Sequence, residues 1–214
     1  MKSIKVKISE REKMSRKIEI QEHVKDYRQR LISLYDSIDV DILEKAINTF
    51  IDCFKNGKTL YIAGNGGSAA TSSHMQCDFG FFVRHFTHFR PKVLSLTDCT
   101  PMLTAIGNDN CYDDIFIEQL RGSFEKGDVL LTISASGNSK NVIKATEYAN
   151  EKEGTTICFV GFDGGLLKEK SQLAIHTANS KGDYGPIEDL HMILDHLIIS
   201  YLVKDKEFLE INKC

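Results

Sequence analysis

The amino-acid sequence predicts a three-layer α/β/α fold, with a five-stranded parallel sheet between helices. Five short runs rich in valine, isoleucine and leucine occur at residues 60–63, 93–96, 129–133, 157–160 and 173–175, most of them separated by a helix-length segment. The runs are continuously apolar, which is typical of parallel strands buried on both faces. The length of 214 residues suits one such domain with helical additions.

Two helices are expected before the first strand, over residues 20–37 and 40–54. Apolar residues recur in both at helical spacing, and Asn56 and Gly57 form a helix-ending signal after the second. The last helix is expected over 187–203. We therefore expect an N-terminal arm at 1–18, N-terminal helices at 19–57, a main domain at 58–205 and a C-terminal tail at 206–214.

Composition and charge exclude several classes of function. The formal net charge of −3 and the pI of about 6.2 are not the basic footprint of a nucleic-acid-binding protein. There is no run of about 18 apolar residues to span a membrane, and the N-terminus lacks the apolar region of a secretory signal. Without any C-x-x-C spacing, the six cysteines are expected to be free and mostly buried thiols. We expect a cytoplasmic protein that binds neither nucleic acid nor membrane.

A glycine-rich turn, GNGGS at 64–68, follows the first predicted strand. Ligands of parallel α/β sheets bind beyond the carboxyl ends of the strands, so this turn is a candidate site. Glycine lets the backbone approach a ligand closely, and the N–H groups that open the following helix favour anions. The turn matches neither GxGxxG nor a Walker A loop, so nucleotide binding is not favoured. A plain tight turn is the alternative interpretation.

A serine-rich loop, SASGNS at 134–139, follows the third predicted strand. Hydroxyl groups and backbone N–H groups at a helix start can hold a phosphate dianion without a lysine. Capping the helix would require only one serine, so the three serines favour phosphate binding.

His74 and Asp78 lie four residues apart on the helix expected after the glycine loop, so they share a face. Such a pair can bind a metal or act in acid–base catalysis. A surface or capping pair has the same spacing, but the position beside the glycine loop favours a functional role.

The last helix offers the polar residues Glu188, His191, Asp195 and His196. Spacing alone pairs Glu188 with His191, or His191 with Asp195. Glu188 and His196 are separated by about 12 Å along a helix and about 80° of rotation, so their geometry does not indicate shared ligation.

The two loops together resemble the sugar isomerase (SIS) domain family. The matching segments are GNGGSAATSSH at 64–74 and SASGNSKNVIKA at 134–145, with further agreement in LTAIGND at 103–109 and IEDLH at 187–191. The resemblance covers about residues 20–203, and within the family the chain is similar to phosphoheptose isomerases. It implies a SIS-type fold and a homotetramer with active sites between subunits, in which the last helix completes a neighbour's pocket.

The resemblance implies a reaction and a role for each candidate residue. The expected reaction converts sedoheptulose 7-phosphate to a glycero-manno-heptose 7-phosphate through an enediol, for heptose biosynthesis. Asp78 would be the base and His196 the opposing acid or base, with His191 kept as a rival. A zinc ion would be held by His74, Asp78, Glu188 and His196. Substrate contacts are implied for Asn65, Gly66, Gly67, Ser68, Asn108, Asp109, Ser134, Ala135, Ser136, Ser139 and Glu188.

Three positions depart from the family pattern. Asp78 replaces the usual glutamate, Glu188 replaces the usual glutamine, and Ala135 replaces a threonine of the serine loop. Two carboxylates among two imidazoles suit a divalent ion, because without one the carboxylates repel and one pKa rises. The departures therefore favour a metal-assisted isomerase.

Three other functions fit parts of this pattern. Since Asp78 is one methylene shorter than glutamate, the chain could isomerise a different phosphosugar. Some SIS relatives are non-catalytic binding modules, including one that binds a bacterial replication initiator, but such a module could dispense with the histidines and carboxylates. A sugar-phosphate-sensing regulator would normally carry a DNA-binding domain, and the sequence shows no basic helix-turn-helix segment.

Overall fold

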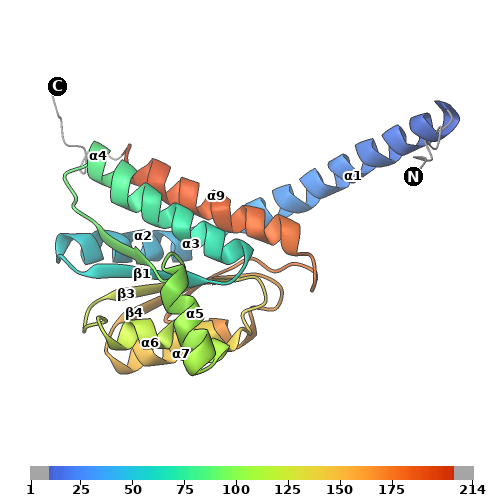
Figure 1. Cartoon of the computed structure of the whole chain (residues 1–214). Coiled ribbons are helices and arrows are strands. Elements are labelled where there is room, and N and C mark those ends of the chain that lie inside the picture. The colour runs from blue at the N-terminus through green and yellow to red at the C-terminus, as the bar shows by residue number, and fades with distance from the viewer. Residues whose placement is uncertain (1–9, 205–214) are drawn as a thin grey trace.

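The computed structural model describes residues 10–204, and its centre is one five-stranded sheet (Figure 1). All strand pairs are parallel, in the order β2-β1-β3-β4-β5. The strands are β1 (Thr59–Gly64), β2 (Lys92–Ser95), β3 (Val129–Ser134), β4 (Thr155–Val160) and β5 (Leu173–His176). The predicted fold class is confirmed, and each strand lies within a few residues of its predicted position.

Helices cover both faces of the sheet, as Figure 1 shows. On one face, α2 (Val40–Lys55), α3 (Gly67–Cys77) and α9 (Tyr184–Leu202) enclose an apolar core around Phe50 and Phe79. On the other face, a second core around Phe116 and Leu130 lies under α5 (Thr100–Asp109), α6 (Ile117–Arg121), α7 (Lys140–Glu151) and α8 (Gly165–Lys170). The central strand β3 is buried along its whole length, which explains its continuously apolar sequence.

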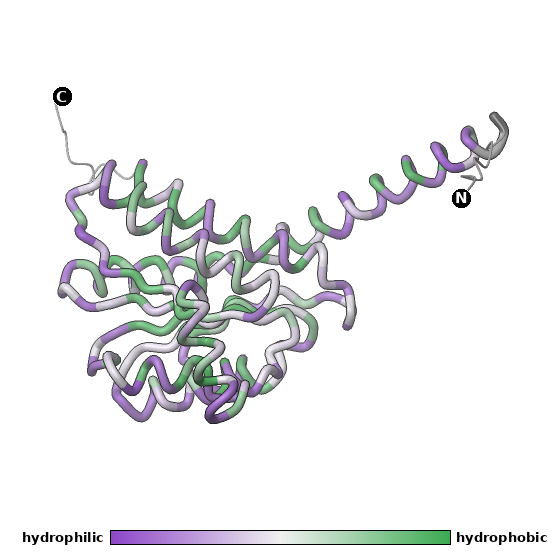
Figure 2. Tube along the Cα trace, in the orientation of Figure 1, coloured by the Kyte–Doolittle hydropathy of each residue, from purple (hydrophilic) through white to green (hydrophobic). Residues whose placement is uncertain are grey.

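The first helix, α1 (Glu10–Asp36), is longer than expected and projects from the body (Figures 1 and 2). It runs without a break through residues 18 and 19, where the sequence suggested a boundary between arm and helix. Its C-terminal half is fastened to the start of α9, because the Tyr27 hydroxyl donates to the Asp189 carboxylate at 2.6 Å and Arg30 pairs with Asp183. The expected tail at 206–214 lies outside the described residues.

Two features differ from the sequence-based expectations. A π-helical segment, η1 (Asp78–Val83), continues α3 into the short α4 (Arg84–Phe86), although hydrophobic periodicity gave no sign of it. Among the five cysteines within residues 10–204, only Cys53 and Cys158 are buried, and desolvation raises the pKa of each thiol to about 12. The expectation of mostly buried cysteines was wrong, since three others lie at exposed positions: Cys77, Cys99 and Cys111.

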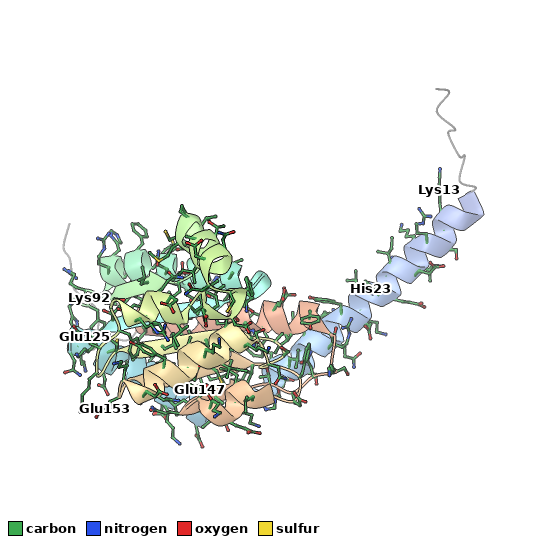
Figure 3. All side chains as sticks on the ribbon, turned by 60° about the horizontal axis from the view of Figure 1, so that its bottom comes forward. Lys13, His23, Lys92, Glu125, Glu147 and Glu153 are labelled. Carbon is green, nitrogen blue, oxygen red and sulfur yellow. The ribbon has the colours of Figure 1, made fainter. Side chains whose placement is uncertain are left out.

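The outer surface is charged in both signs. Figure 3 shows Lys92, Glu125, Glu147 and Glu153 around the outside of the body and Lys13 and His23 along α1. Across the described residues, the structure contains no helix that is both long and apolar enough to cross a bilayer.

Candidate active site

A polar cavity lies at the carboxyl edge of the sheet, where β1 and β3 run side by side. Its volume is about 160 Å³. The glycine loop after β1 and the serine loop after β3 form most of its wall, and α9 supplies the rest. The lining residues are Asn65, Ser68, Ile133, Ser134, Ala135, Ser136, Ser139, Tyr184 and Glu188. The parallel pairing of two adjacent strands therefore brings together loops that are 70 residues apart in sequence.

The glycine loop lets α9 approach the start of α3. Gly66 has a φ of +56°, a value that favours glycine, and α3 begins at the next residue. A Cβ on Gly67 would lie only 2.3 Å from Glu188 Oε2, so a side chain there would displace this carboxylate. Gly66 and Gly67 thus place Glu188 beside Asn65 and Ser68 in the cavity wall.

The serine loop leaves its third hydroxyl available to a ligand. Ser134 Oγ accepts a hydrogen bond from the Gly137 N–H at 3.1 Å, and Ser136 Oγ accepts one from the Asn138 N–H at 3.3 Å. Ser139 is the N-cap residue of α7, yet its side chain makes no capping hydrogen bond. Helices α3 and α7 both begin beside this cavity. The positive ends of their dipoles favour an anion there.

Four His and Asp side chains from α3, η1 and α9 gather in one group. The Nε2 atoms of His74 and His196 lie 3.1 Å apart, and His74 Nε2 lies 3.6 Å from Asp78 Oδ2 and 3.8 Å from Asp195 Oδ2. One potential ligand atom from each of these residues lies within 4.8 Å of the others. We call this set the His/Asp group.

The His/Asp group fits a zinc ion. Ligand atoms of a tetrahedral zinc with bonds of about 2.0–2.1 Å lie roughly 3.3 Å apart, which is close to the three distances from His74 Nε2 to its neighbours. Asp195 is fully buried, and neither of its carboxylate oxygens has a hydrogen-bond partner among the described residues. Burial, followed by the nearby charge of Asp78, raises the pKa of Asp195 to about 8. A divalent cation would satisfy both conditions.

The structure does not bring Glu188 to His196 within one chain. Glu188 lines the cavity two helical turns before the His/Asp group, and Asp195 occupies the position that the resemblance gave to Glu188. The cause is the regular rise of α9, which separates positions 188 and 196 by about 12 Å. The signal that could have identified Asp195 is its place between Leu194 and Ile198 on the buried stripe of the helix, where an aspartate is costly.

The structure gives His191 a different environment from His196. The His191 ring is buried, with its centroid 6.1 Å from that of Phe159, and its nitrogens have no hydrogen-bond partner in the described part of the chain. Desolvation lowers the pKa of His191 to about 3. His191 thus remains neutral in the core, whereas His196 is exposed beside His74.

Two expected substrate contacts lie elsewhere. Asn108 and Asp109 are exposed at the end of α5, where the Asn108 amide donates to the Asp109 carboxylate at 2.8 Å. Within residues 10–204, the cavity lining includes neither of them. Their contact with substrate stays a prediction.

Tyr184 is a wall residue that the sequence did not indicate. It begins α9, lines the cavity, and packs edge-to-face on Phe162 with ring centroids 5.1 Å apart. Phe162 adopts a φ of +45°, a strained value for a non-glycine residue, and its N–H donates to Asn179 Oδ1. Only the tertiary fold brings this turn beside Tyr184.

The cavity and the His/Asp group share the same two helices. Ser68 and His74 lie on α3, and Glu188 and Asp195 lie on α9. The seven positions from Glu188 to Asp195 correspond to a rise of about 10 Å. The cavity wall at Glu188 and the His/Asp group at Asp195 are therefore separated by about 10 Å along α9.

Comparisons with known proteins identify the family of the chain. A family model described as SIS domain matches residues 22–161, which is more than half of the chain. The chain is 36% identical to "Phosphoheptose isomerase 2" of Campylobacter jejuni over 80% of this chain and 84% of that protein. It is 34% identical to the phosphoheptose isomerase of Aneurinibacillus thermoaerophilus over 87% of this chain and 95% of that protein.

Solved structures show the same likeness. The structure of phosphoheptose isomerase GmhA from Neisseria gonorrhoeae matches with a TM-score of 0.75 at 28% identity, covering 87% of this chain and 97% of that chain. A phosphoheptose isomerase from Francisella tularensis matches with a TM-score of 0.77, and at 21% identity it supports the fold alone. The protein is thus a SIS-domain protein. Within that class, the chain belongs to the phosphoheptose isomerase family, and the resemblance seen in its sequence is confirmed.

Proposed function

We propose that this protein isomerises sedoheptulose 7-phosphate to a glycero-manno-heptose 7-phosphate, for heptose biosynthesis in the cytoplasm. The proposal is carried by the arrangement of the cavity and the His/Asp group along α9, where the wall residue Glu188 and Asp195 are separated by a rise of about 10 Å. With carbon–carbon bonds of about 1.5 Å, an extended seven-carbon sugar phosphate spans about 10 Å from phosphorus to C1. Such a molecule places its phosphate in the cavity while C1 and C2 lie at the His/Asp group.

The serine loop supports phosphate binding. The Ser139 hydroxyl and the N-termini of α3 and α7 offer donors to phosphate oxygens. The positive ends of the α3 and α7 helix dipoles stabilise the negative charge of the phosphate. Asn65 and Glu188, which lie in the same wall, can bond the sugar hydroxyls. The expected contacts of Asn108 and Asp109 remain part of the proposal and require the segment at the end of α5 to approach the sugar.

The His/Asp group supplies the acid–base chemistry. Asp78 takes the proton from C1 of the ketose, and an enediol forms as the C2 carbonyl oxygen gains a proton. His196 moves the hydroxyl proton between O1 and O2, and Asp78 returns its proton to C2. The predicted zinc would be held by His74, Asp78, Asp195 and His196, and when bound it would stabilise the negative charge on the enediol oxygens.

Purified protein incubated with sedoheptulose 7-phosphate and zinc tests this function. We expect NMR spectra to show the aldose phosphate, and no conversion would refute the assignment. Asp78→Asn should reduce turnover at least about a hundredfold while the sugar phosphate still binds, because the base is lost and the phosphate cavity is intact. Asp52→Asn, an exposed change on α2, is the matched control, and full activity of Asp78→Asn would refute the assigned base.

We also propose that the chain forms a homotetramer. Met14, Ile18 and Ile32 on α1 are 60%, 49% and 51% exposed, which is unusual for an isolated helix in water. An apolar groove between α2 and α9, lined by Val40 and Tyr201 among others, adds a second uncovered surface. His74 and His196 already meet within one chain, so a neighbour is not required to join them. Light scattering at micromolar concentration should give four chains, and a monomer would contradict this.

A further inference from the structure

A pair of hydrogen-bonded amides, from the half-buried Asn65 and the buried Asn141, joins the glycine loop to the start of α7. Asn65 Nδ2 donates to Asn141 Oδ1 at 2.9 Å, and Asn141 Nδ2 donates to Asn65 Oδ1 at 2.8 Å. Asn141 is only 1% exposed, at the second position of α7, whereas Asn65 lines the cavity. Reciprocal bonds of this kind hold both side chains in one plane.

The orientation of the pair is fixed by a backbone group. The Val142 N–H donates to Asn141 Oδ1 at 2.9 Å, and a backbone N–H cannot accept. The atom of Asn141 that faces Val142 and Asn65 Nδ2 must therefore be oxygen. It follows that the other amide atom of Asn141 is nitrogen, and that it donates to the oxygen of Asn65.

A tyrosine hydroxyl completes the arrangement. Tyr112 Oη donates to Asn65 Oδ1 at 2.8 Å. Tyr112 begins the 3₁₀ segment η2 (Tyr112–Asp114), which contacts α5 and α7 and is linked to α7 by a 2.7 Å ion pair between Lys144 and Asp114. The hydroxyl is thus held in place by an element that follows α5.

These three contacts leave Asn65 one way to interact with a ligand. Both acceptor sites of Oδ1 are occupied, by Asn141 and by Tyr112, and one N–H of Nδ2 is used by Asn141. The remaining N–H is the only unused hydrogen-bonding group of the amide. Asn65 is consequently a donor to the cavity and not an acceptor.

We propose that Asn141 and Tyr112 are positioning residues that hold Asn65 as a hydrogen-bond donor to an oxygen of the bound phosphosugar. The proposal rests on the proposed function for the identity of the ligand. Without Tyr112, Asn65 Oδ1 loses one of its two hydrogen-bond donors, so the amide is held less firmly and its unused N–H is less well aligned with an oxygen of the ligand. Neither Tyr112 nor Asn141 needs to touch the substrate.

A double-mutant cycle with Asn65→Ala and Tyr112→Phe tests whether Tyr112 acts on the ligand through Asn65, an arrangement that we call the relay. Binding of sedoheptulose 7-phosphate is measured by calorimetry, together with KM and kcat. We expect Tyr112→Phe to raise Kd and KM about three- to tenfold with kcat little changed, since one neutral hydrogen bond is involved. In the Asn65→Ala background, the same change should have no further effect, because Tyr112 acts through Asn65.

The control and a second variant keep the result interpretable. Tyr35→Phe, which removes an exposed hydroxyl on α1, should leave Kd unchanged, and Tyr112→Phe should keep the parent's melting temperature because Tyr112 is 61% exposed. Asn141→Ala should also show no added loss of affinity in the Asn65→Ala background.

Three outcomes separate this relay from the proposed function. Additive effects of Asn65→Ala and Tyr112→Phe would overturn the relay, because they would mean that Tyr112 contacts the sugar itself. An unchanged Kd in Tyr112→Phe would overturn it as well. A parent protein that does not bind sedoheptulose 7-phosphate at all would refute the proposed function, and the assignment of Asn65 as a donor to that sugar would fall with it.

Discussion

His74 Nε2 and His196 Nε2 lie 3.1 Å apart, although 122 positions separate the two residues in the chain. One histidine comes from the helix that opens at the glycine loop and the other from the last helix. Two imidazole nitrogens at this distance are either hydrogen-bonded or share a cation, and the two neighbouring carboxylates favour the cation.

The first prediction concerns this pair. Either His74→Ala or His196→Ala should weaken zinc binding at least about a hundredfold, because even changes to outer-shell partners cost about 10–100-fold in metal affinity. Elemental analysis after dialysis measures the zinc retained per chain. His85→Ala removes an exposed histidine of α4 outside the His/Asp group and should retain the parent's zinc. Equal zinc contents in all these proteins would exclude the site.

A second prediction separates metal binding from stability at Asp195. Asp195→Leu should abolish high-affinity zinc binding, because the buried carboxylate is lost from the group. In metal-free protein, the same change should raise the free energy of unfolding by about 1–3 kcal/mol, since it removes an unpartnered buried polar group. Urea unfolding with and without chelator measures both effects. A Leu variant that is less stable without metal would show that Asp195 has a structural partner instead.

The third prediction concerns the serine loop. Ser139→Ala should raise the Kd for sedoheptulose 7-phosphate about ten- to a hundredfold, as expected for a hydrogen bond to a charged group of about 1.5–3 kcal/mol. Inorganic phosphate should lose a similar factor, because the lost contact is to the phosphate and not to the sugar. Ser180→Ala, outside the cavity lining, serves as the control. A loss confined to the sugar phosphate would place Ser139 against the sugar.

A fourth prediction uses the buried ring of His191. Its folded-state pKa of about 3 lies below its ordinary 6.5, so only the unfolded chain takes up a proton between these values. The parent should therefore lose stability as the pH falls through 6.5, at about 1.4 kcal/mol per pH unit. His191→Leu should lack this contribution, so that its stability relative to the parent improves by about 2 kcal/mol between pH 7.5 and pH 5.0. Denaturant titrations at both pH values measure this, and parallel pH profiles would mean that His191 is protonated in the fold.

The fold and the two loops were predictable from the sequence for a simple physical reason. Strands buried on both faces must be apolar throughout, and glycine- and serine-rich turns after such strands must meet at one edge of a parallel sheet. The loops at 64–68 and 134–139 accordingly line one cavity. His74 and Asp78 share a helix face because of their spacing, and this local geometry also required no tertiary information.

Only the tertiary structure decided which residues of the last helix lie beside His74 and Asp78. Spacing along α9 could not show the rotation of the helix about its axis, so it left the choice among its polar residues open, and only the resemblance favoured Glu188 and His196, with His191 as a rival. Packing of α9 against α3 turns Asp195 and His196 toward His74, places His191 in the core and leaves Glu188 in the wall of the polar cavity. The same holds for Tyr112 and Asn141, whose contacts with Asn65 depend on side chains from three separate elements. The sequence determines which chemical groups are available and which of them share a local element, because spacing and propensity act between neighbouring residues. The packing of distant helices selects which of those groups can act together.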